Sequence, residues 1–254
     1  MVKYVLDRLD TFGHYFVFLW KLLKYSVKRP YYIKQFFNEI EHLGVNSLFI
    51  IILSSGSMGM IFALQIVVIL QTFQAEISTG AMVAVAMSRE IAPVITTLML
   101  IAKNGSAMAA ELGTMKVTEQ IDALESMSIS PEHYLVLPKV AASMVIFPTL
   151  TMLANLIGIM GAFVVSIYIY GIESGGYLNY LFDFLSPRDI VMGLIKAFVM
   201  GFIVSTICCF YGLNASKGAK GVGDSATKAV VASSVAILVA DYLLTSIILR
   251  FIYI

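Results

Sequence analysis

Residues 48–73 read LFIIILSSGSMGMIFALQIVVILQTF, an apolar run that contains no charged side chain. A helix needs about 20 such residues to cross the hydrocarbon core of a bilayer, so this run is long enough to span a membrane. It marks a first span near 45–73, and four further apolar runs follow near 81–102, 135–169, 189–213 and 227–252. We therefore predict an all-α integral membrane protein in which residues 44–254 form one domain of five transmembrane helices.

The composition of the whole chain supports this fold class. Of its 254 residues 59% are hydrophobic and only 13% are charged, whereas soluble domains carry about 25% charged residues. The net charge of +1 gives no basis for nucleic-acid binding. Cys208 and Cys209 are adjacent and the histidines lie far apart, so we expect no disulfide framework and no metal site. The charged N-terminus has no small-residue cleavage site, and we expect no removable signal peptide.

Residues 1–43 form an amphipathic region rather than a span. Apolar side chains recur there at helical spacing, basic side chains occupy other positions, and Trp20 and Tyr25 add amphipathic rings. The pattern predicts one or two helices that lie in the cytoplasmic interface of the membrane, interrupted at Pro30. The alternative is a soluble amphipathic helix packed on a partner. The apolar positions are Leu6, Leu9, Phe12, Phe16, Leu19, Leu23, Ile33, Phe36, Phe37, Ile40 and Leu43, and the basic ones are Lys3, Arg8, Lys21, Lys24, Lys28 and Arg29.

The distribution of Lys and Arg predicts the orientation. Residues 1–44, 103–139 and 214–228 hold most of these side chains, whereas the segments 74–80 and 170–188 hold only Arg188. Because basic residues collect in cytoplasmic loops, we expect a cytoplasmic N-terminus and a C-terminus on the periplasmic side.

The segment 103–134, between the second and third spans, is the least lipid-like stretch after the N-terminus. Val117, Ile121 and Leu124 form one apolar stripe at helical spacing, and we expect Gly113 to separate this stripe from the part before it. A helix start is expected where Pro131 follows Ser130. A short amphipathic helix here fits a cytoplasmic coupling helix that docks into a soluble motor, and it equally fits a loop helix that lies on the membrane surface.

Four ionisable residues fall inside the predicted spans, namely Arg89, Glu90, Lys196 and Asp241. At 1.5 Å per residue they lie ~10–16 Å below the outer ends of their spans. An unpaired charge at such a depth costs ~3 kcal/mol or more, so we expect these charges to pair across helices. Their functional interpretation is a network at a lipid-headgroup site or at a hinge that changes with ATP state. The alternatives are static pairing, or a Lys196 side chain that reaches the outer interface.

Two patches of small residues predict close helix contacts. The first span holds Ser55, Gly56, Ser57 and Gly59, and the third holds Gly158 and Gly161, flanked by Ala154 and Ala162. The second patch packs either within the subunit or across a dimer. Gln65 is a lone polar group above the first patch, and it either bonds to a neighbouring helix or contacts lipid.

Four runs of the sequence form a distinctive set of motifs: REIAPV at 89–94, AAELGTMKVTEQIDAL at 109–124, PEHYLVLPK at 131–139 and GVGDSATKAVV at 221–231. They resemble the motifs of the MlaE/YrbE permease family, and the resemblance covers about residues 40–252. The chain departs from the usual pattern where Lys103-Asn104 replace Gly-Arg, Ser128 replaces Gly, and Lys139 replaces Arg, so that Lys103 and Lys139 keep the charge and lose the guanidinium fork.

The resemblance implies a permease subunit of an ABC transporter that moves phospholipid between the inner and outer membranes of a bacterium and maintains outer-membrane lipid asymmetry. It implies a homodimer in the inner membrane, a cytoplasmic ATPase that holds ATP and Mg²⁺, a periplasmic hexamer of MCE-domain proteins and often a STAS-domain protein on the ATPase. The chain itself would hold no cofactor and catalyse no reaction. The implied lipid-binding residues are Phe62, Leu64, Gln65, Ile69, Leu70, Phe73 and Arg89. The implied ATPase-coupling residues are Glu111, Gly113, Thr114, Met115, Lys116, Thr118, Glu119, Gln120 and Asp122.

Two other functions compete with this interpretation. An ion-coupled secondary transporter of a hydrophobic substrate is disfavoured by five spans, by the lack of an evident internal repeat and by the lack of a pair of broken helices. An intramembrane enzyme is disfavoured because the spans hold no histidine cluster, no metal-ligand spacing and no GxSxG element.

Overall fold

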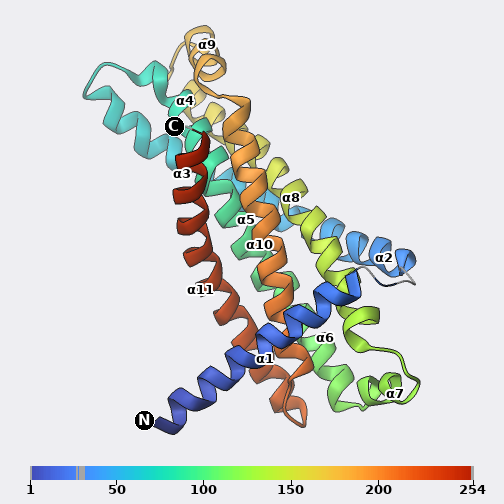
Figure 1. Cartoon of the computed structure of the whole chain (residues 1–254). Helices are drawn as coiled ribbons and strands as arrows, with labels where there is room; N and C mark the ends of the chain where they lie inside the picture. Colours follow the sequence, from blue (N-terminus) through green and yellow to red (C-terminus); the bar gives the residue numbers. More distant parts are fainter. Residues whose placement is uncertain (1, 27, 29–31, 253–254) are drawn as a thin grey trace.

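The computed structural model describes the backbone of residues 2–26, 28 and 32–252, and the side chains of residues 13–26, 28 and 32–250. All regular structure in this part of the chain is helical. Figure 1 shows an elongated bundle in which the start of α1 and the end of α11 lie at opposite ends. The side chains of Lys3, Leu6, Arg8, Leu9, Phe12, Arg29 and Pro30, which enter the predicted amphipathic pattern, lie outside the described set.

Five segments of the described chain are long and apolar enough to cross a membrane, and each overlaps one predicted span. The all-α membrane fold class is therefore confirmed, while the roles predicted for the interfacial and coupling helices stay predictions. The segments are Ile33–Gln71, Glu76–Val117, Glu132–Ile169, Pro187–Leu213 and Gly218–Arg250.

Most of these segments contain short changes of helical pitch. The first joins α2 (Ile33–Gly44), the 3₁₀ turn η1 (Val45–Ser47) and α3 (Leu48–Gln71). The second runs through η2 (Glu76–Ser78), α4 (Thr79–Ala86), the π turn η3 (Met87–Ile91), α5 (Ala92–Leu100), the π turn η4 (Ile101–Gly105) and α6 (Ser106–Val117). The third contains the π turn η5 (Glu132–Val136), α8 (Leu137–Val164) and the π turn η6 (Val165–Ile169), and the last two are α10 (Pro187–Leu213) and α11 (Ala219–Ile252). The other helices are α1 (Val2–Ser26), α7 (Gln120–Ser126) and α9 (Ser174–Phe184).

The two predicted small-residue patches pack against each other within the chain. A methyl group added to Gly59 of α3 would collide with the main chain of Gly158 on α8. Gly161 likewise lies against the carbonyl oxygen of Gly56, so a side chain there would displace α3. Small residues thus let α3 and α8 approach closely, as the spacing predicted.

The second segment continues as helix well past residue 102, where the predicted span ends. Residues 103–117 remain helical because Met108, Ala109 and Leu112 are buried in the core, with α6 packed against α10 and α11. The expectation that Gly113 separates two parts is wrong: this residue lies inside α6, against Ala215 and Val222.

The break in this region comes later. Glu119 has a φ of 60°, a left-handed conformation that ends α6 before α7 begins. The predicted stripe of Val117, Ile121 and Leu124 is therefore divided between two helices. Ser128 also has a positive φ, 61°, which explains why glycine suits the position that Ser128 occupies here. The helix resumes at Pro131, as predicted from the Ser-Pro pair.

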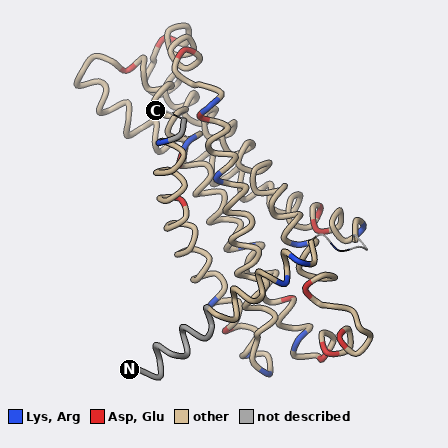
Figure 2. Tube along the Cα trace, in the orientation of Figure 1, with Lys and Arg blue, Asp and Glu red and all other residues tan. Residues whose placement is uncertain are grey.

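Helix α1 crosses the end of the bundle that also holds α6 and α7 (Figure 1). Phe18 and Leu22 bury one of its faces, and the hydroxyls of Tyr15 and Thr206 on α10 are 2.9 Å apart. Burial raises the pKa of Tyr15, although its hydrogen bond with Thr206 acts in the opposite direction. Phe16, Trp20 and Leu23 remain exposed, which leaves a second apolar face free for a membrane surface or a partner. Figure 2 shows that most Lys and Arg residues lie at this same end.

The opposite end carries α9, a helix that the sequence analysis did not predict. Tyr177 anchors it, since this side chain is fully buried and its ring packs against Gly80 of α4 and edge-on to Phe163. Burial raises the pKa of Tyr177. Tyr180 is exposed on α9 beside the exposed Phe182 and Phe184, so this end presents an amphipathic aromatic ring of the kind that favours membrane interfaces.

Candidate functional site

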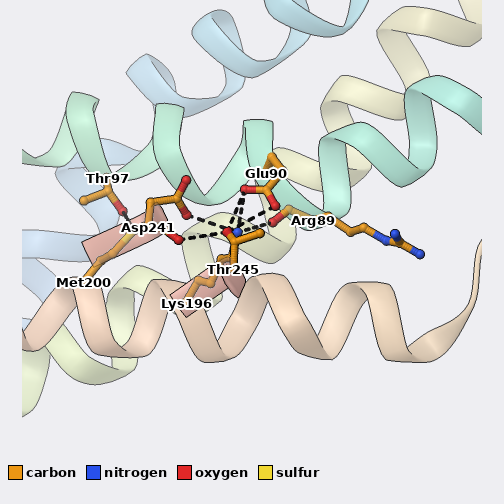
Figure 3. Close-up of polar contacts among 7 residues, drawn as sticks. All are labelled: Arg89, Glu90, Thr97, Lys196, Met200, Asp241 and Thr245. Atoms are coloured by element: carbon orange, nitrogen blue, oxygen red, sulfur yellow. Dashed lines mark hydrogen bonds and ion pairs between the residues drawn. The ribbon is translucent and has the colours of Figure 1, made fainter. Parts of the chain in front are cut away.

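A fully buried lysine lies at the centre of the candidate site. The side chain of Lys196 is 0% exposed, and its Nζ lies 2.5 Å from Oε2 of Glu90 and 3.1 Å from Oδ1 of Asp241. The same Nζ donates a hydrogen bond of 3.1 Å to the main-chain carbonyl oxygen of Arg89. The Lys196–Asp241 contact is an ion pair without hydrogen-bond alignment at Oδ1. Figure 3 shows these groups converging from three helices.

Each partner comes from a separate membrane-length segment. Glu90 belongs to the π turn η3, Lys196 to α10 and Asp241 to α11. Thr245 lies one turn after Asp241 and extends the cluster, because its Oγ1 bonds to the Asp241 carbonyl at 2.8 Å and lies 3.3 Å from Oε1 of Glu90. The π turn matters because it inserts a residue into the helical repeat and thereby re-aims the side chains around Arg89 and Glu90.

The prediction that the intramembrane charges pair across helices holds for Glu90, Lys196 and Asp241. The alternative in which Lys196 extends to the outer interface is excluded by its complete burial. These contacts establish the pairing and do not by themselves assign a function to it.

Arg89 takes a different direction from the one predicted. Its guanidinium points away from Lys196 in Figure 3, and its Nε lies 2.8 Å from Oδ1 of Asp189. Among the residues that the structure describes, it is the main-chain carbonyl of Arg89 that contacts Lys196. Adjacent residues point ~100° apart on a helix. Arg89 and Glu90 therefore reach different residues of α10, Asp189 and Lys196, which lie two turns apart. Arg89 thus pairs with the acidic Asp189, and Glu90 pairs with the basic Lys196.

Asp189 is a site residue that the sequence analysis missed. Its side chain is 1% exposed and has two roles, since it pairs with Arg89 and its Oδ2 accepts a 3.0 Å hydrogen bond from the backbone N–H of Ser186. That second bond is part of a capping box at the start of α10. The Ser-Pro-Arg-Asp run at 186–189 carries the capping-box spacing and was the signal available in the sequence.

The lysine cluster has more negative than positive charge. Lys196 faces the two carboxylates of Glu90 and Asp241, while the Arg89 guanidinium that would balance them is held beside Asp189. Arg89 and Glu90 keep side-chain exposures of 30% and 41% in the single chain, whereas Lys196 has none. Both exposed groups are therefore accessible from the surface of the bundle.

Apart from Arg89, which belongs to the π turn η3, the residues predicted to bind lipid lie along α3 and just beyond its end. Leu64, Gln65, Ile69 and Phe73 are exposed, so the larger part of this set forms an open apolar surface. Phe62 and Leu70 are half-buried, and Phe62 packs against the core. Gln65 makes no hydrogen bond to any residue that the structure describes, so an interhelical bond within the chain does not account for it.

The predicted coupling residues surround the α6–α7 turn. Lys116 on α6 forms a 2.7 Å ion pair with Asp122 on α7, and Gln120 donates a 3.0 Å hydrogen bond to Thr118 across the turn. Met115 is half-buried, Gly113 is buried, and Glu111 turns toward Lys139 on α8. The exposed members of the predicted set are Glu111, Thr114, Thr118, Glu119, Gln120 and Asp122.

The fold and the site define a multi-pass α-helical membrane protein in which a cluster of ion pairs joins three of the spans. Comparison with known proteins identifies its family: residues 36–247 match the family model described as Permease MlaE. The chain belongs to the MlaE permease family, and several of its relatives are described as probable ABC transporter permease proteins.

Three similar proteins illustrate the range of the family. A probable ABC transporter permease protein of Rickettsia conorii is 37% identical over 94% of this chain and 92% of its own length. The intermembrane phospholipid transport system permease protein MlaE of Haemophilus influenzae is 37% identical, over 81% of this chain and 79% of its own. The chloroplastic protein trigalactosyldiacylglycerol 1 of Arabidopsis thaliana is 40% identical, over 82% of this chain and 59% of its own.

Proposed function

We propose that this chain is the permease subunit of an ABC transporter that moves phospholipid between the inner and outer membranes of a bacterium and so maintains outer-membrane lipid asymmetry. The observation that carries the proposal is the charged site of Lys196, Glu90 and Asp241, placed within the spans of an MlaE-family chain. The name of the Haemophilus influenzae relative, a phospholipid transport permease, supports the choice of cargo.

The chemistry of the site suits an amphipathic substrate. The exposed apolar side chains of α3, with Ile69 59% exposed and Phe73 74% exposed, offer a surface for acyl chains. The half-exposed charges of Arg89 and Glu90 offer polar contacts for a headgroup, and a guanidinium matches the geometry of a phosphate. The buried Lys196 behind them, paired with Glu90 and Asp241, holds the three helices in register, which keeps the polar groups in place.

The assembly that we propose supplies the missing parts. A second copy of the chain would complete the lipid site, and a cytoplasmic ATPase would bind the exposed surface of the α6–α7 turn and hold ATP and Mg²⁺. A periplasmic hexamer of MCE-domain proteins would receive or deliver lipid at the α9 end, and a STAS-domain protein is a further candidate partner. This arrangement places the N-terminus in the cytoplasm and the C-terminus on the periplasmic side, which fits the collection of Lys and Arg at the α1 end.

The decisive experiment asks what drives lipid movement. The tagged chain is purified in mild detergent, and its bound proteins and lipids are identified by mass spectrometry. The complex is then reconstituted in vesicles, and transfer of a fluorescent phospholipid is measured between vesicles that contain this lipid and vesicles that lack it. We expect an ATPase to co-purify and lipid transfer to require ATP. Recovery of the chain without any ATPase, or transfer driven by an ion gradient alone, would favour the secondary-transporter alternative and refute the proposal.

The role of the charged site is tested in the same assay. Glu90→Ala and Asp241→Ala should each reduce transport more than they reduce the amount of protein in the membrane, because the cluster spans three helices that must keep their register. Lys228→Ala, an exposed change at the start of α11, serves as the control. Transport that survives both changes would show that the pairing is only structural.

A further inference from the structure

A second buried lysine lies outside the charged site, at the α1 end of the bundle. The side chain of Lys139 on α8 is 4% exposed, and its Nζ lies 2.6 Å from Oε1 of Glu39 and 2.8 Å from Oε2 of Glu111. Glu39 belongs to α2 and Glu111 to α6. One ammonium group therefore joins the helix that leads into the first span to the helix that leads out of the second.

A separate set of hydrogen bonds joins the same two segments. The side-chain amide of Asn104, in the π turn η4, donates a 2.9 Å bond to the carbonyl oxygen of Leu43 at the end of α2. The hydroxyl of Ser47 donates a 3.1 Å bond to Oδ1 of Asn104. Asn104 and Ser47 are both buried, so these bonds are shielded from competition by water.

Both segments continue without a break into regions that the proposed function uses. From Glu39, the helical run α2–η1–α3 leads directly to the exposed apolar surface of α3 that includes Leu64 and Ile69. From Glu111, α6 leads to the exposed residues of the α6–α7 turn. The contacts of Lys139 and Asn104 therefore connect, at this end, the segment that leads to the turn predicted to bind the ATPase with the segment that leads to the helix predicted to bind lipid.

The two carboxylates around Lys139 are not equivalent. Glu39 is 19% exposed and Glu111 is 49% exposed, so the α2 contact is the better shielded and the α6 contact the more accessible. A partner that docks at the α6–α7 turn would approach the Glu111 side of the bridge first.

We propose that Lys139 is a positioning residue that transmits movement of the α6–α7 turn to α3 through Glu39, so that ATP hydrolysis on the partner changes the lipid-facing helix. This inference rests on the proposed function. It adds α2 to the coupling machinery, and it assigns to Glu39 and Lys139 a role in the amount of lipid moved for each ATP hydrolysed.

The test compares two neighbouring carboxylates of α2. Glu39→Gln removes the charge that faces Lys139 and leaves Glu111 to pair with it, so the lysine is not left alone. Glu41→Gln makes the same chemical change at an exposed position that forms no ion pair within the described residues. Both variants are reconstituted in the full complex, and ATP hydrolysis and phospholipid transfer are measured on the same samples.

We expect Glu39→Gln to lower the ratio of lipid transferred to ATP hydrolysed by about fivefold or more, the size of a typical coupling between sites. Glu41→Gln should match the unmodified complex. An unchanged ratio in Glu39→Gln would overturn the proposal, and so would an equal loss in both variants. If the unmodified complex shows no ATP-dependent transfer at all, the proposed function fails instead, and the two failures are thereby distinguished.

A second pair of variants separates transmission from simple stability. Lys139→Arg keeps a cation between the two carboxylates, and Lys139→Met removes it while keeping a side chain of similar length. The proposal expects Lys139→Arg to retain most of the transfer ratio and Lys139→Met to lose it, with assembled complex recovered in both cases. A Lys139→Met complex that assembles and keeps the original ratio would refute the role of the bridge even if Glu39→Gln were impaired.

Discussion

Two buried lysines, Lys196 in the middle of the bundle and Lys139 at its α1 end, have the same pattern of partners in different surroundings. Each is less than 5% exposed and each faces two carboxylates from two other helices. Around Lys139 the more exposed carboxylate, Glu111, lies near the end of a span, where water can solvate it. Around Lys196 the corresponding group, Glu90, lies well inside a membrane-length segment.

This difference indicates how each cluster responds when it is broken. A carboxylate that loses its partner can recover hydration at the end of a span, but hydrocarbon offers no such compensation. We therefore interpret the Lys196 cluster as a feature on which folding of the spans depends, in addition to the role in transport proposed above. The Lys139 cluster is interpreted as a contact that can change during a transport cycle at moderate cost.

The largest effect is expected for Lys196→Met. This change leaves Glu90 and Asp241 without their cation, and removing one partner of a buried ion pair typically costs ~3–5 kcal/mol. The measurement is the midpoint of thermal unfolding of the purified chain in detergent, together with the yield of folded protein. Lys228→Met, on the exposed surface of α11, is the matched control. Equal unfolding midpoints for the two variants would contradict the view that the central cluster stabilises the spans.

A smaller effect is expected for Lys139→Met. Glu111 is already half-exposed and only Glu39 becomes poorly solvated, so we expect a loss of ~1–2 kcal/mol, within the range for leaving one polar group unsatisfied. The same unfolding measurement places this variant between Lys196→Met and the control. If Lys139→Met were the more damaging of the two, the contrast between the clusters would be reversed.

Features that depend on local composition were predictable from the sequence. The five spans follow from apolar length, and close helix contacts at the Gly59 and Gly158 patches follow from small residues at one-turn spacing. The sequence left open whether the second patch packs within the subunit or across a dimer. The pairing of Glu90, Lys196 and Asp241 followed from the cost of isolated charges in lipid.

Features that depend on tertiary geometry were not predictable in this way. Arg89 was assigned to the wrong cluster because four charges of balanced sign suggested one network, whereas the π turn η3 and the capping box of α10 direct it to Asp189. The break after Val117 depends on the left-handed conformation of Glu119, which no propensity of glutamate indicates. The bridge from Lys139 to Glu39 joins residues 100 positions apart, and the sequence carried no sign that α2 would pack there.

The smallest effect on stability is expected for Asp241→Asn. Lys196 has two carboxylates for one positive charge, so removing the charge of Asp241 relieves repulsion between the acids while Lys196 keeps its 2.5 Å contact with Glu90. We expect the unfolding midpoint to shift by the equivalent of ~1 kcal/mol or less, the size of a mild substitution. Phospholipid transfer should nevertheless fall, since under the proposed function the charge of this cluster acts on the substrate as well as on the fold. Glu90→Gln provides the comparison, because it removes the closer partner of Lys196 and should destabilise the chain more. If Asp241→Asn unfolded as readily as Lys196→Met, then both carboxylates would be needed to hold the lysine, and the surplus of negative charge would have no role separate from folding.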